Sequence, residues 1–277
     1  MNNVIDGTEA SRVLRNNVKK EIVRKKITPS LTVIQIGDNK ASDIYVRNKK
    51  KACEEVGIKF ELLKFNDTIS QDVVINEIKR LNDDVMVNGI LVQLPLPIGF
   101  DEGLIINSIN PVKDVDGLTY QNVGNLVLEN DCLAPCTPLG VMELLDMYNV
   151  NLSKKNVCLI GRSNLVGKPL IQMLLKRDAT VSICHSKSVD IKNYTKMADV
   201  LIVAAGHPNL VTKNMVKDGA VVIDVGINKE NDYLCGDVDF KEVSKKASLI
   251  TPVPRGVGPM TVACLLKNVA KAYEIQH

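Results

Sequence analysis

The chain has 277 residues, of which 45% are hydrophobic and 24% charged, and its formal net charge is +3. This composition is that of an ordinary globular protein, and it excludes a disordered chain, a collagen and a long coiled coil. The weak net charge, the four Phe and the absence of Trp argue against dedicated nucleic-acid binding, which uses basic patches and aromatic stacking platforms. At roughly 150 residues per domain, the length predicts about two domains.

The first half of the chain alternates between helical and extended hydrophobic patterns. The pattern predicts a helix over 10–23, a strand over 31–36, a helix over 40–56 that ends at Gly57, a strand over 58–65, a helix from Ser70 to 81, and a strand over 89–94. This β-α-β-α-β order predicts a three-layer α/β domain, with a parallel sheet between helices. Pro and Gly are frequent from 95 to 140, which predicts a loop-rich zone that leads to a domain boundary.

A second alternating series follows a helix expected over about 139–148. Its expected strands are 157–160, 180–184, 200–204 and 221–225. A loop rich in Pro and Gly begins at Thr251, and a last helix is expected to run to about Tyr273. The series predicts a second α/β domain, of the Rossmann type.

Neither a membrane partner, nor a metal site, nor a disulfide framework is expected from the sequence. The apolar stretches are too short to span a bilayer and the N-terminus has no signal-peptide core, so we expect a cytoplasmic protein without a membrane partner. Seven scattered Cys, no C-x2-C pair and only three His argue against both a metal site and a disulfide framework.

The turn after the strand 157–160 is a candidate nucleotide site. Gly161 and Gly167 bracket a short segment between a strand and a helix, where backbone N–H groups and the positive helix end can face a pyrophosphate. The spacing differs from G-x-G-x-x-G, so the motif alone does not decide between a nucleotide site and an ordinary turn. The next strand ends in His185-Ser186-Lys187 instead of the Asp or Glu typical of NAD sites. Together with Arg162, these donors favour NADP, because they suit a 2′-phosphate.

Four polar residues in the first half form a candidate chemical site. Tyr45 and Lys49 lie four residues apart on one helix and therefore share a face. Gln93 comes near the carboxyl end of a strand, where open α/β sheets place ligands, and Asp116 follows in a Lys-Asp-Val-Asp-Gly loop. A lysine held against an amide in a cleft can lose its charge and act as a base. Each residue also has an ordinary explanation, as a packing residue, a solvated charge, a strand-end cap or a turn former.

A set of longer motifs follows along the chain in this order: Tyr45-Val-Arg-Asn-Lys-Lys-Lys51 with Gly57-Ile58, Gly89-Ile-Leu-Val-Gln-Leu-Pro-Leu96, Lys113-Asp-Val-Asp-Gly117, Pro135-Cys-Thr-Pro138, Gly161-Arg-Ser163 with Val166-Gly167, Cys184-His-Ser-Lys187, Asp224-Val-Gly-Ile227, and Thr251-Pro-Val-Pro254 with Gly256-Val-Gly-Pro-Met-Thr261. Together, and in this order, they closely resemble the bifunctional methylenetetrahydrofolate dehydrogenase/methenyltetrahydrofolate cyclohydrolase family over essentially the whole chain.

The resemblance implies two α/β domains flanking a cleft. A folate-binding catalytic domain would comprise 1–138 and 255–277, and a Rossmann-type NADP-binding domain would comprise 139–254. The resemblance further implies oxidation of 5,10-methylenetetrahydrofolate with NADP⁺, hydrolysis of the methenyl product to 10-formyltetrahydrofolate, a role in one-carbon metabolism for purine, methionine and histidine biosynthesis, and a homodimer.

The resemblance also assigns roles to individual residues. Lys49 would be the central catalytic residue, assisted by Gln93, with Tyr45 packing on the folate and Asp116 hydrogen-bonding the pterin. Pro259 would also lie at the substrate. The implied cofactor contacts are Gly161, Arg162, Ser163, Ser186 and Ile227.

Three alternatives remain at this point. A short-chain dehydrogenase also uses Tyr-x3-Lys, but there the pair follows the glycine-rich turn, whereas Tyr45 precedes Gly161. A monofunctional dehydrogenase would lack the hydrolytic step, and Lys49, Gln93 and Asp116 together argue against it. A non-catalytic nucleotide sensor would bind the cofactor without a poised folate site.

One position departs from the family pattern. The family reads Pro-Gly-Gly in the last loop, where this chain has Pro254-Arg255-Gly256. If the backbone there needs a positive φ, Arg255 is strained; if not, its side chain could reach an anionic ligand.

Overall fold

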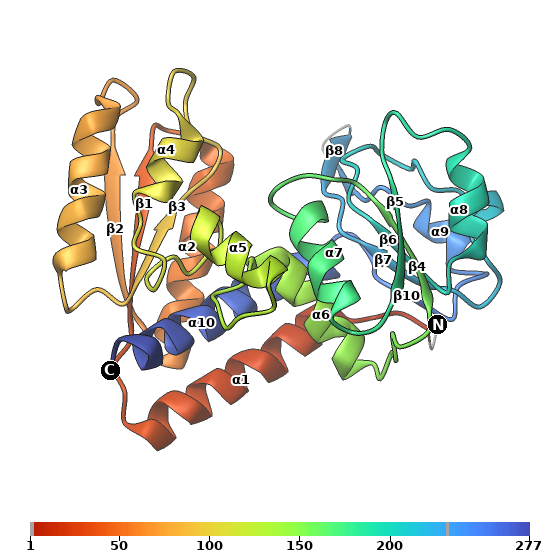
Figure 1. The fold of residues 1–277 in the computed structure, drawn as a ribbon, viewed down its shortest axis with the longest axis horizontal. Helices are drawn as coiled ribbons and strands as arrows, with labels where there is room; N and C mark the ends of the chain where they lie inside the picture. The colour runs from red at the N-terminus through yellow and green to blue at the C-terminus, as the bar shows by residue number, and fades with distance from the viewer. Residues whose placement is uncertain (1–2, 231–232) are drawn as a thin grey trace. The chain divides into compact units, whose positions relative to one another are not determined.

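The computed structural model describes residues 3–230 and 233–277, and the chain forms two compact units (Figure 1). Unit 1 comprises Met1–Ser11 and Thr137–Thr261, and unit 2 comprises Arg12–Cys136 and Val262–His277. The first helix, α1 (Gly7–Lys25), and the last, α10 (Val257–Gln276), each contribute residues to both units.

Unit 2 contains a parallel sheet of three strands in the order β2-β1-β3. These are β1 (Ser30–Ile36), β2 (Lys59–Phe65) and β3 (Gly89–Val92). Because β2 and β3 pair with opposite edges of β1, the order in which the chain adds strands reverses there, and open α/β sheets bind ligands at the carboxyl ends of the strands at such a reversal.

Helices lie on both faces of this sheet. Alternate residues of the strands, including Ile34 and Ile90, form a core with α3 (Gln71–Asp83) and α4 (Glu102–Asn107). α2 (Lys40–Val56) lies on the other side of the sheet from α3 (Figure 1). Its start is capped by Asn39, whose side chain accepts from the N–H groups of Ala41 and Ser42, and it ends at Gly57 with φ +88°. The three-layer arrangement expected from the sequence is therefore confirmed.

Unit 1 contains a parallel sheet of five strands in the order β10-β7-β6-β4-β5. The strands are β4 (Asn156–Ile160), β5 (Thr180–Cys184), β6 (Val200–Val203), β7 (Val221–Asp224) and β10 (Leu249–Ile250). β4 pairs with β5 on one side and with β6 on the other. This is the reversal of strand order that marks the nucleotide edge of a Rossmann-type sheet, and it confirms the fold expected for this part of the chain.

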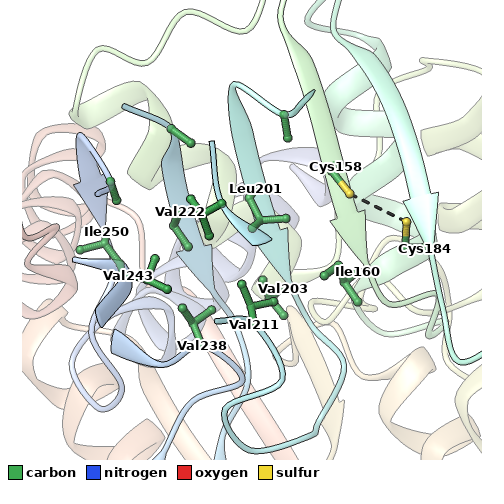
Figure 2. Close-up of a cluster of buried hydrophobic side chains, with 14 residues drawn as sticks. Cys158, Ile160, Cys184, Leu201, Val203, Val211, Val222, Val238, Val243 and Ile250 are labelled. Atoms are coloured by element: carbon green, nitrogen blue, oxygen red, sulfur yellow. Dashed lines mark hydrogen bonds between the residues drawn. The ribbon is translucent and has the colours of Figure 1, made fainter. Parts of the chain in front are cut away.

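A cluster of small and branched side chains fills one face of this sheet (Figure 2). Leu201, Val203 and Val222 come from the strands, and Val211 and Val238 come from segments beyond them. The sulfur atoms of Cys158 and Cys184 lie 3.9 Å apart in this cluster, which is a contact distance and not that of a disulfide bond. The other elements of unit 1 are α6 (Cys136–Met147), α7 (Gly167–Leu175), α8 (Ile191–Met197), the 3₁₀ turn η1 (Lys213–Met215), α9 (Phe240–Val243) and the hairpin strands β8 (Asn228–Glu230) and β9 (Tyr233–Cys235).

The unit boundaries differ from the expected domain boundaries at both chain ends. Residues 3–11 belong to the unit of the five-stranded sheet, because Val4 pairs with Ile250 and the N–H of Ile5 donates to the Ile250 carbonyl at 2.8 Å. Residues 255–261 belong to the same unit, and the N–H of Gly7 donates to the Arg255 carbonyl at 2.9 Å. Such pairing between distant segments has no local sequence pattern.

Several short elements lie in stretches expected to be loops. α4 and α5 (Tyr120–Val127) interrupt the loop-rich zone, and each begins at a side-chain cap, from Asp101 and Thr119 respectively. α6 begins three residues before its expected start, and α10 begins at Val257, inside the expected last loop. Within residues 3–230 and 233–277, no helix is long and apolar enough to cross a membrane. Over the same residues, no group of three or more His, Cys, Asp or Glu is placed to hold a metal ion.

Candidate active site

Lys49 and Gln93 form a hydrogen-bonded pair in unit 2. Lys49 lies on α2, and its Nζ donates to Gln93 Oε1 at 2.9 Å. Gln93 directly follows β3, and its N–H continues the sheet by donating to the Ile34 carbonyl at 2.8 Å. The Gln93 Nε2 donates to the Leu94 carbonyl at 2.7 Å. This second bond fixes the amide so that its oxygen faces the lysine.

Burial sets the electrostatics of Lys49. Desolvation lowers the pKa of its ammonium group, and the nearby Asp116 carboxyl offsets part of that effect. Gln93 is 9% exposed and offers a neutral acceptor instead of a compensating charge. Lys49 therefore holds its proton less firmly than a solvated lysine, which is a property that general acid–base chemistry near neutral pH requires.

Asp114 builds the loop that carries Asp116. Its Oδ1 accepts from the N–H of Gly117 at 3.0 Å, and its Oδ2 accepts from the N–H of Thr119 at 2.8 Å and from Asn122 Nδ2 at 2.9 Å. Gly117 has φ +70°, and a Cβ there would lie 2.5 Å from the Ala134 carbonyl carbon. A turn-forming role was one explanation for Asp116, but the structure assigns that role to Asp114. The Asp116 carboxyl takes no part in these bonds.

The Asp116 carboxyl lies beside the Cys136 thiol and Lys49. Burial raises the pKa of Asp116, while Lys49 and a hydrogen bond with Cys136 act in the opposite direction. The Cys136 Sγ also lies 3.3 Å from the Val115 carbonyl, and its pKa is raised well above the ordinary value by burial and then by Asp116. Cys136 is thus a neutral thiol that supports this carboxyl.

Tyr45 lies one turn before Lys49 on α2. Its side chain is 47% exposed, while the Lys49 side chain is half-buried. An exposed ring on the same helical face as a desolvated lysine offers an apolar surface to a flat ligand.

The turn after β4 is built for a close approach of backbone. Gly161 has φ +128°, and a Cβ there would lie 2.2 Å from the Ala204 carbonyl oxygen. Gly167 opens α7, and a Cβ there would lie 2.5 Å from the Gly161 carbonyl oxygen. Ser163 Oγ accepts from the N–H groups of Val166 and Gly167 at 3.2 and 3.4 Å. The two glycines therefore let this turn, which we call the glycine cradle, pack closely on the Ala204 backbone and on the start of α7. A close-packed turn of this kind, between a strand and a helix, is where a Rossmann-type sheet binds a pyrophosphate.

The candidate donors for a 2′-phosphate follow adjacent strand ends. The N–H of Gly161 donates to the Cys184 carbonyl at 2.9 Å, so the turns after β4 and β5 start side by side. Arg162 and Ser186 are both exposed in these turns. The turn after β5 is held by the His185 N–H, which donates to Ser188 Oγ at 2.9 Å, and by the Lys187 N–H, which donates to His185 Nδ1 at 3.1 Å.

Two further candidate residues belong to unit 1. Ile227 follows β7 and is 51% exposed. Pro259 is half-buried near the start of α10, and its carbonyl accepts from Ser11 Oγ at 3.0 Å. The structure therefore groups Lys49, Gln93 and Asp116 in unit 2, and it places the five cofactor candidates and Pro259 in unit 1.

Sequence reasoning missed the contributions of Asp114 and Cys136. Both lie within the motifs Lys-Asp-Val-Asp-Gly and Pro-Cys-Thr-Pro, but a motif does not tell which of the two Asp holds the loop and which lies beside Lys49. The spacing of Asp114 from Gly117, three residues on, is the local signal that could have found the cap.

Arg255 adopts the strained conformation that was one of the two possibilities for this position. Its φ is +79°, a left-handed value that an L side chain rarely takes. Gly7 packs on the same turn so closely that a Cβ there would lie 1.7 Å from the Gly256 carbonyl oxygen. The loop therefore has little room to relax the strain.

We expect Arg255→Gly to stabilise unit 1 by about 1 kcal/mol, because glycine adopts this φ without a steric penalty. The measurement is urea unfolding of both proteins followed by circular dichroism. Arg255→Ala is the matched control, since it removes the charge and keeps the strain. An equal gain in the alanine variant would assign the effect to the side chain and contradict backbone strain.

These two sites define a class of protein. Unit 1 has the sheet order and glycine cradle of a dinucleotide-binding domain, and unit 2 has a desolvated lysine, an amide and a carboxyl suited to proton transfer. The class is that of nucleotide-dependent enzymes.

Comparison with known families makes the assignment specific. A family model described as the tetrahydrofolate dehydrogenase/cyclohydrolase catalytic domain matches residues 5–116, and the NAD(P)-binding domain of the same family matches residues 135–277. The chain belongs to the tetrahydrofolate dehydrogenase/cyclohydrolase family, which confirms the resemblance found in its motifs.

Individual relatives agree over nearly the whole chain. The "Bifunctional protein FolD" of Hydrogenobaculum sp. is 51% identical over 98% of this chain and 99% of that protein. The crystal structure of the bifunctional enzyme FolD from Campylobacter jejuni is 48% identical, with a TM-score of 0.96 over 99% of both chains. A Trypanosoma brucei dehydrogenase-cyclohydrolase, solved in complex with NADP and an inhibitor, is 36% identical with a TM-score of 0.93, over 98% of this chain and 97% of that one.

Proposed function

We propose that the protein oxidises 5,10-methylenetetrahydrofolate to the 5,10-methenyl cation with NADP⁺ and then hydrolyses this cation to 10-formyltetrahydrofolate. The observation that carries the hydrolytic half is the 2.9 Å bond from Lys49 to Gln93, with the pKa of the lysine lowered by burial. Membership of a family named for both activities supports the pairing of the two reactions in one chain.

In this proposal unit 1 holds the cofactor. The fit rests on the Gly161–Gly167 cradle, where bound NADP⁺ supplies the hydride acceptor. Ser163 and the start of α7 would bind the pyrophosphate, and Arg162 and Ser186 would bind the 2′-phosphate with N–H and O–H donors. Ile227 would contact the cofactor from the segment after β7.

The residues of unit 2 would bind and convert the folate. Asp116 would accept hydrogen bonds from the aminopyrimidinone of the pterin, and the exposed Tyr45 ring would pack on the folate. Pro259 would also contact the substrate. When water adds to the methenyl carbon, Lys49 Nζ would accept its proton, and Gln93 Oε1 would hold that amine in place. The ring nitrogen then takes a proton as its bond to the former methenyl carbon breaks, which yields the 10-formyl product.

A low proton affinity of Lys49 also suits the substrate's charge. A cationic lysine would repel the methenyl cation, whereas a neutral amine does not. We further propose that the protein is a homodimer, as the resemblance implies; the exposed side chains of Tyr233 and Leu234 on the β8–β9 hairpin, 78% and 50% accessible, are compatible with an interface in unit 1.

The proposed function is tested by mixing the protein with 5,10-methylenetetrahydrofolate and either NADP⁺ or NAD⁺, while reduced cofactor and the methenyl species are followed separately. We expect faster reduction with NADP⁺ and little accumulation of the methenyl species. Persistent methenyl product would favour a monofunctional dehydrogenase. Cofactor binding without any reduction would favour a nucleotide sensor.

A further inference from the structure

Asp237 is a fully buried carboxylate that the proposed chemistry does not use. It lies two residues after the hairpin strand β9, in the sequence Gly236-Asp237-Val238, and its exposure is 0%. Burial of a carboxylate is unfavourable unless hydrogen bonds replace its hydration. A buried carboxylate such as Asp237 therefore requires hydrogen-bond donors within the protein.

The Asp237 carboxylate accepts four hydrogen bonds, three from the loop after β6 and one from Asn228, the first residue of β8. Its Oδ2 accepts from the N–H groups of Ala205 and Gly206 at 2.6 and 2.9 Å, and its Oδ1 accepts from the N–H of His207 and the Nδ2 of Asn228, both at 2.8 Å. Three consecutive N–H groups thus converge on one side chain. The segment after β6 takes its conformation from a residue more than twenty positions later in the chain.

The loop that Asp237 holds is part of the glycine cradle. Ala204 directly precedes the three residues whose N–H groups bond to Asp237. Its carbonyl oxygen packs against Gly161, and a Cβ on Gly161 would lie 2.2 Å from this oxygen. β4 and β6 are neighbours at the reversal of strand order, so the loops after them flank the position where a Rossmann-type sheet binds its nucleotide. A shift of Ala205–His207 would therefore change the shape of the cofactor position.

Asp237 also fixes the second loop, after β7. Its partner Asn228 follows Ile227, the residue proposed to contact the cofactor. Gly226 packs on the carboxylate, and a Cβ there would lie 2.2 Å from the Asp237 Cγ. One side chain therefore sets the positions of two of the loops at the carboxyl edge of the sheet.

A second buried aspartate holds Asp237 in place. Asp224 Oδ1 accepts from the N–H of Asp237 at 3.0 Å, and its Oδ2 accepts from the N–H of Val238 at 2.9 Å. Val238 belongs to the apolar cluster of Figure 2, and so does Val211, whose N–H donates to the Asp237 carbonyl at 2.9 Å. The backbone of Asp237 is thus fixed to the core of unit 1, and its carboxylate bonds to the loop after β6.

We infer that Asp237 is a positioning residue for the NADP site, which organises the loops after β6 and β7 without touching the cofactor. The inference rests on the proposed cofactor position at Gly161. It adds a residue that none of the assigned contacts includes.

Asp237→Asn tests the inference. An amide has one acceptor oxygen, so either orientation turns an N–H₂ toward two of the four donors. We expect the Kd for NADPH, measured by fluorescence titration, to rise about tenfold or more, the equivalent of losing one or two satisfied buried bonds. Hydrolysis of supplied 5,10-methenyltetrahydrofolate without cofactor should keep its wild-type rate, which a general loss of structure would not allow.

Asp239→Asn is the matched control. It removes the same charge two residues away, where Asp239 Oδ1 caps α9 by accepting from the Glu242 N–H at 3.3 Å, a role that Asn can also fill. We expect its NADPH affinity to be unchanged. If Asp237→Asn does not fold, Asn228→Ala removes a single donor, and a smaller rise in Kd is then expected.

An unchanged Kd in the folded Asp237→Asn variant, or in Asn228→Ala if the first does not fold, would overturn the inference alone. Parallel loss of binding and of hydrolysis would also overturn it, because the role would then be structural. Failure of the wild-type protein to bind NADPH would instead overturn the proposed function, and the inference with it.

Discussion

Lys49→Met is expected to slow hydrolysis of 5,10-methenyltetrahydrofolate by about 1,000-fold, the middle of the range for loss of a general base. Methionine keeps the length and the apolar stem of lysine but cannot accept a proton from water. Hydride transfer from the methylene carbon moves no proton, so NADP⁺ reduction should fall much less. The rates of NADP⁺ reduction and of methenyl hydrolysis are measured separately. We expect the methenyl species to accumulate in the variant.

Lys51→Met is the control for this prediction. Lys51 is exposed on the same helix and therefore tests the loss of a positive charge from α2 without the bond to Gln93. Both rates should be those of the wild-type protein. Equal losses of both reactions in Lys49→Met would contradict a specific role in proton transfer and would indicate a role in folate binding.

Gly161→Ala is expected to reduce kcat/KM for NADP⁺ by about 100-fold, the scale of a displacement of roughly 1 Å at a binding site. The new Cβ would lie 2.2 Å from a backbone oxygen, which no rotamer change can relieve, and the φ of +128° is itself unfavourable for alanine. The cofactor-free hydrolysis of methenyltetrahydrofolate depends on Lys49 and Gln93 of unit 2 and should persist. The two assays together distinguish a damaged nucleotide site from an unfolded protein.

Gly219→Ala is the control for the effect of placing alanine at a positive φ without a steric clash. Gly219 also has a positive φ, +77°, but a Cβ there would meet no atom within 4 Å. We expect this variant to be destabilised by about 1 kcal/mol and to keep its NADP⁺ kinetics. If Gly219→Ala and Gly161→Ala lose NADP⁺ activity equally, the cradle is not the site of the effect.

The order and type of the long elements could be predicted from the sequence. Short apolar runs located β1 and β4, and helical spacing with Gly57 as its end located α2. The carboxyl-edge position of Gln93 followed from the parallel sheet alone. These features depend on local pattern, which a single sequence contains.

Features that depend on contacts between distant segments could not be predicted in this way. The pairing of Val4 with Ile250 moved the N-terminal segment into unit 1, and nothing near either residue indicates it. Asp237 was not identified because its four partners lie 9 to 32 positions away. The positive φ of Arg255 was one of two open possibilities. The family pattern has glycine at this position, and glycine adopts positive and negative φ alike, so the pattern does not decide the backbone conformation.

The pH dependence of methenyl hydrolysis tests most directly whether Lys49 is the base. The rate should be measured from pH 6 upward, with the uncatalysed hydrolysis subtracted, in the wild-type protein and in Lys49→Met. Because burial lowers the pKa of Lys49, the neutral amine forms as pH rises through a value below the usual 10.5, and the rate should rise and level off there. This limb should be absent in the variant. A wild-type rate that rises only above pH 10.5, or a limb that Lys49→Met retains, would contradict the assignment of Lys49 as the base.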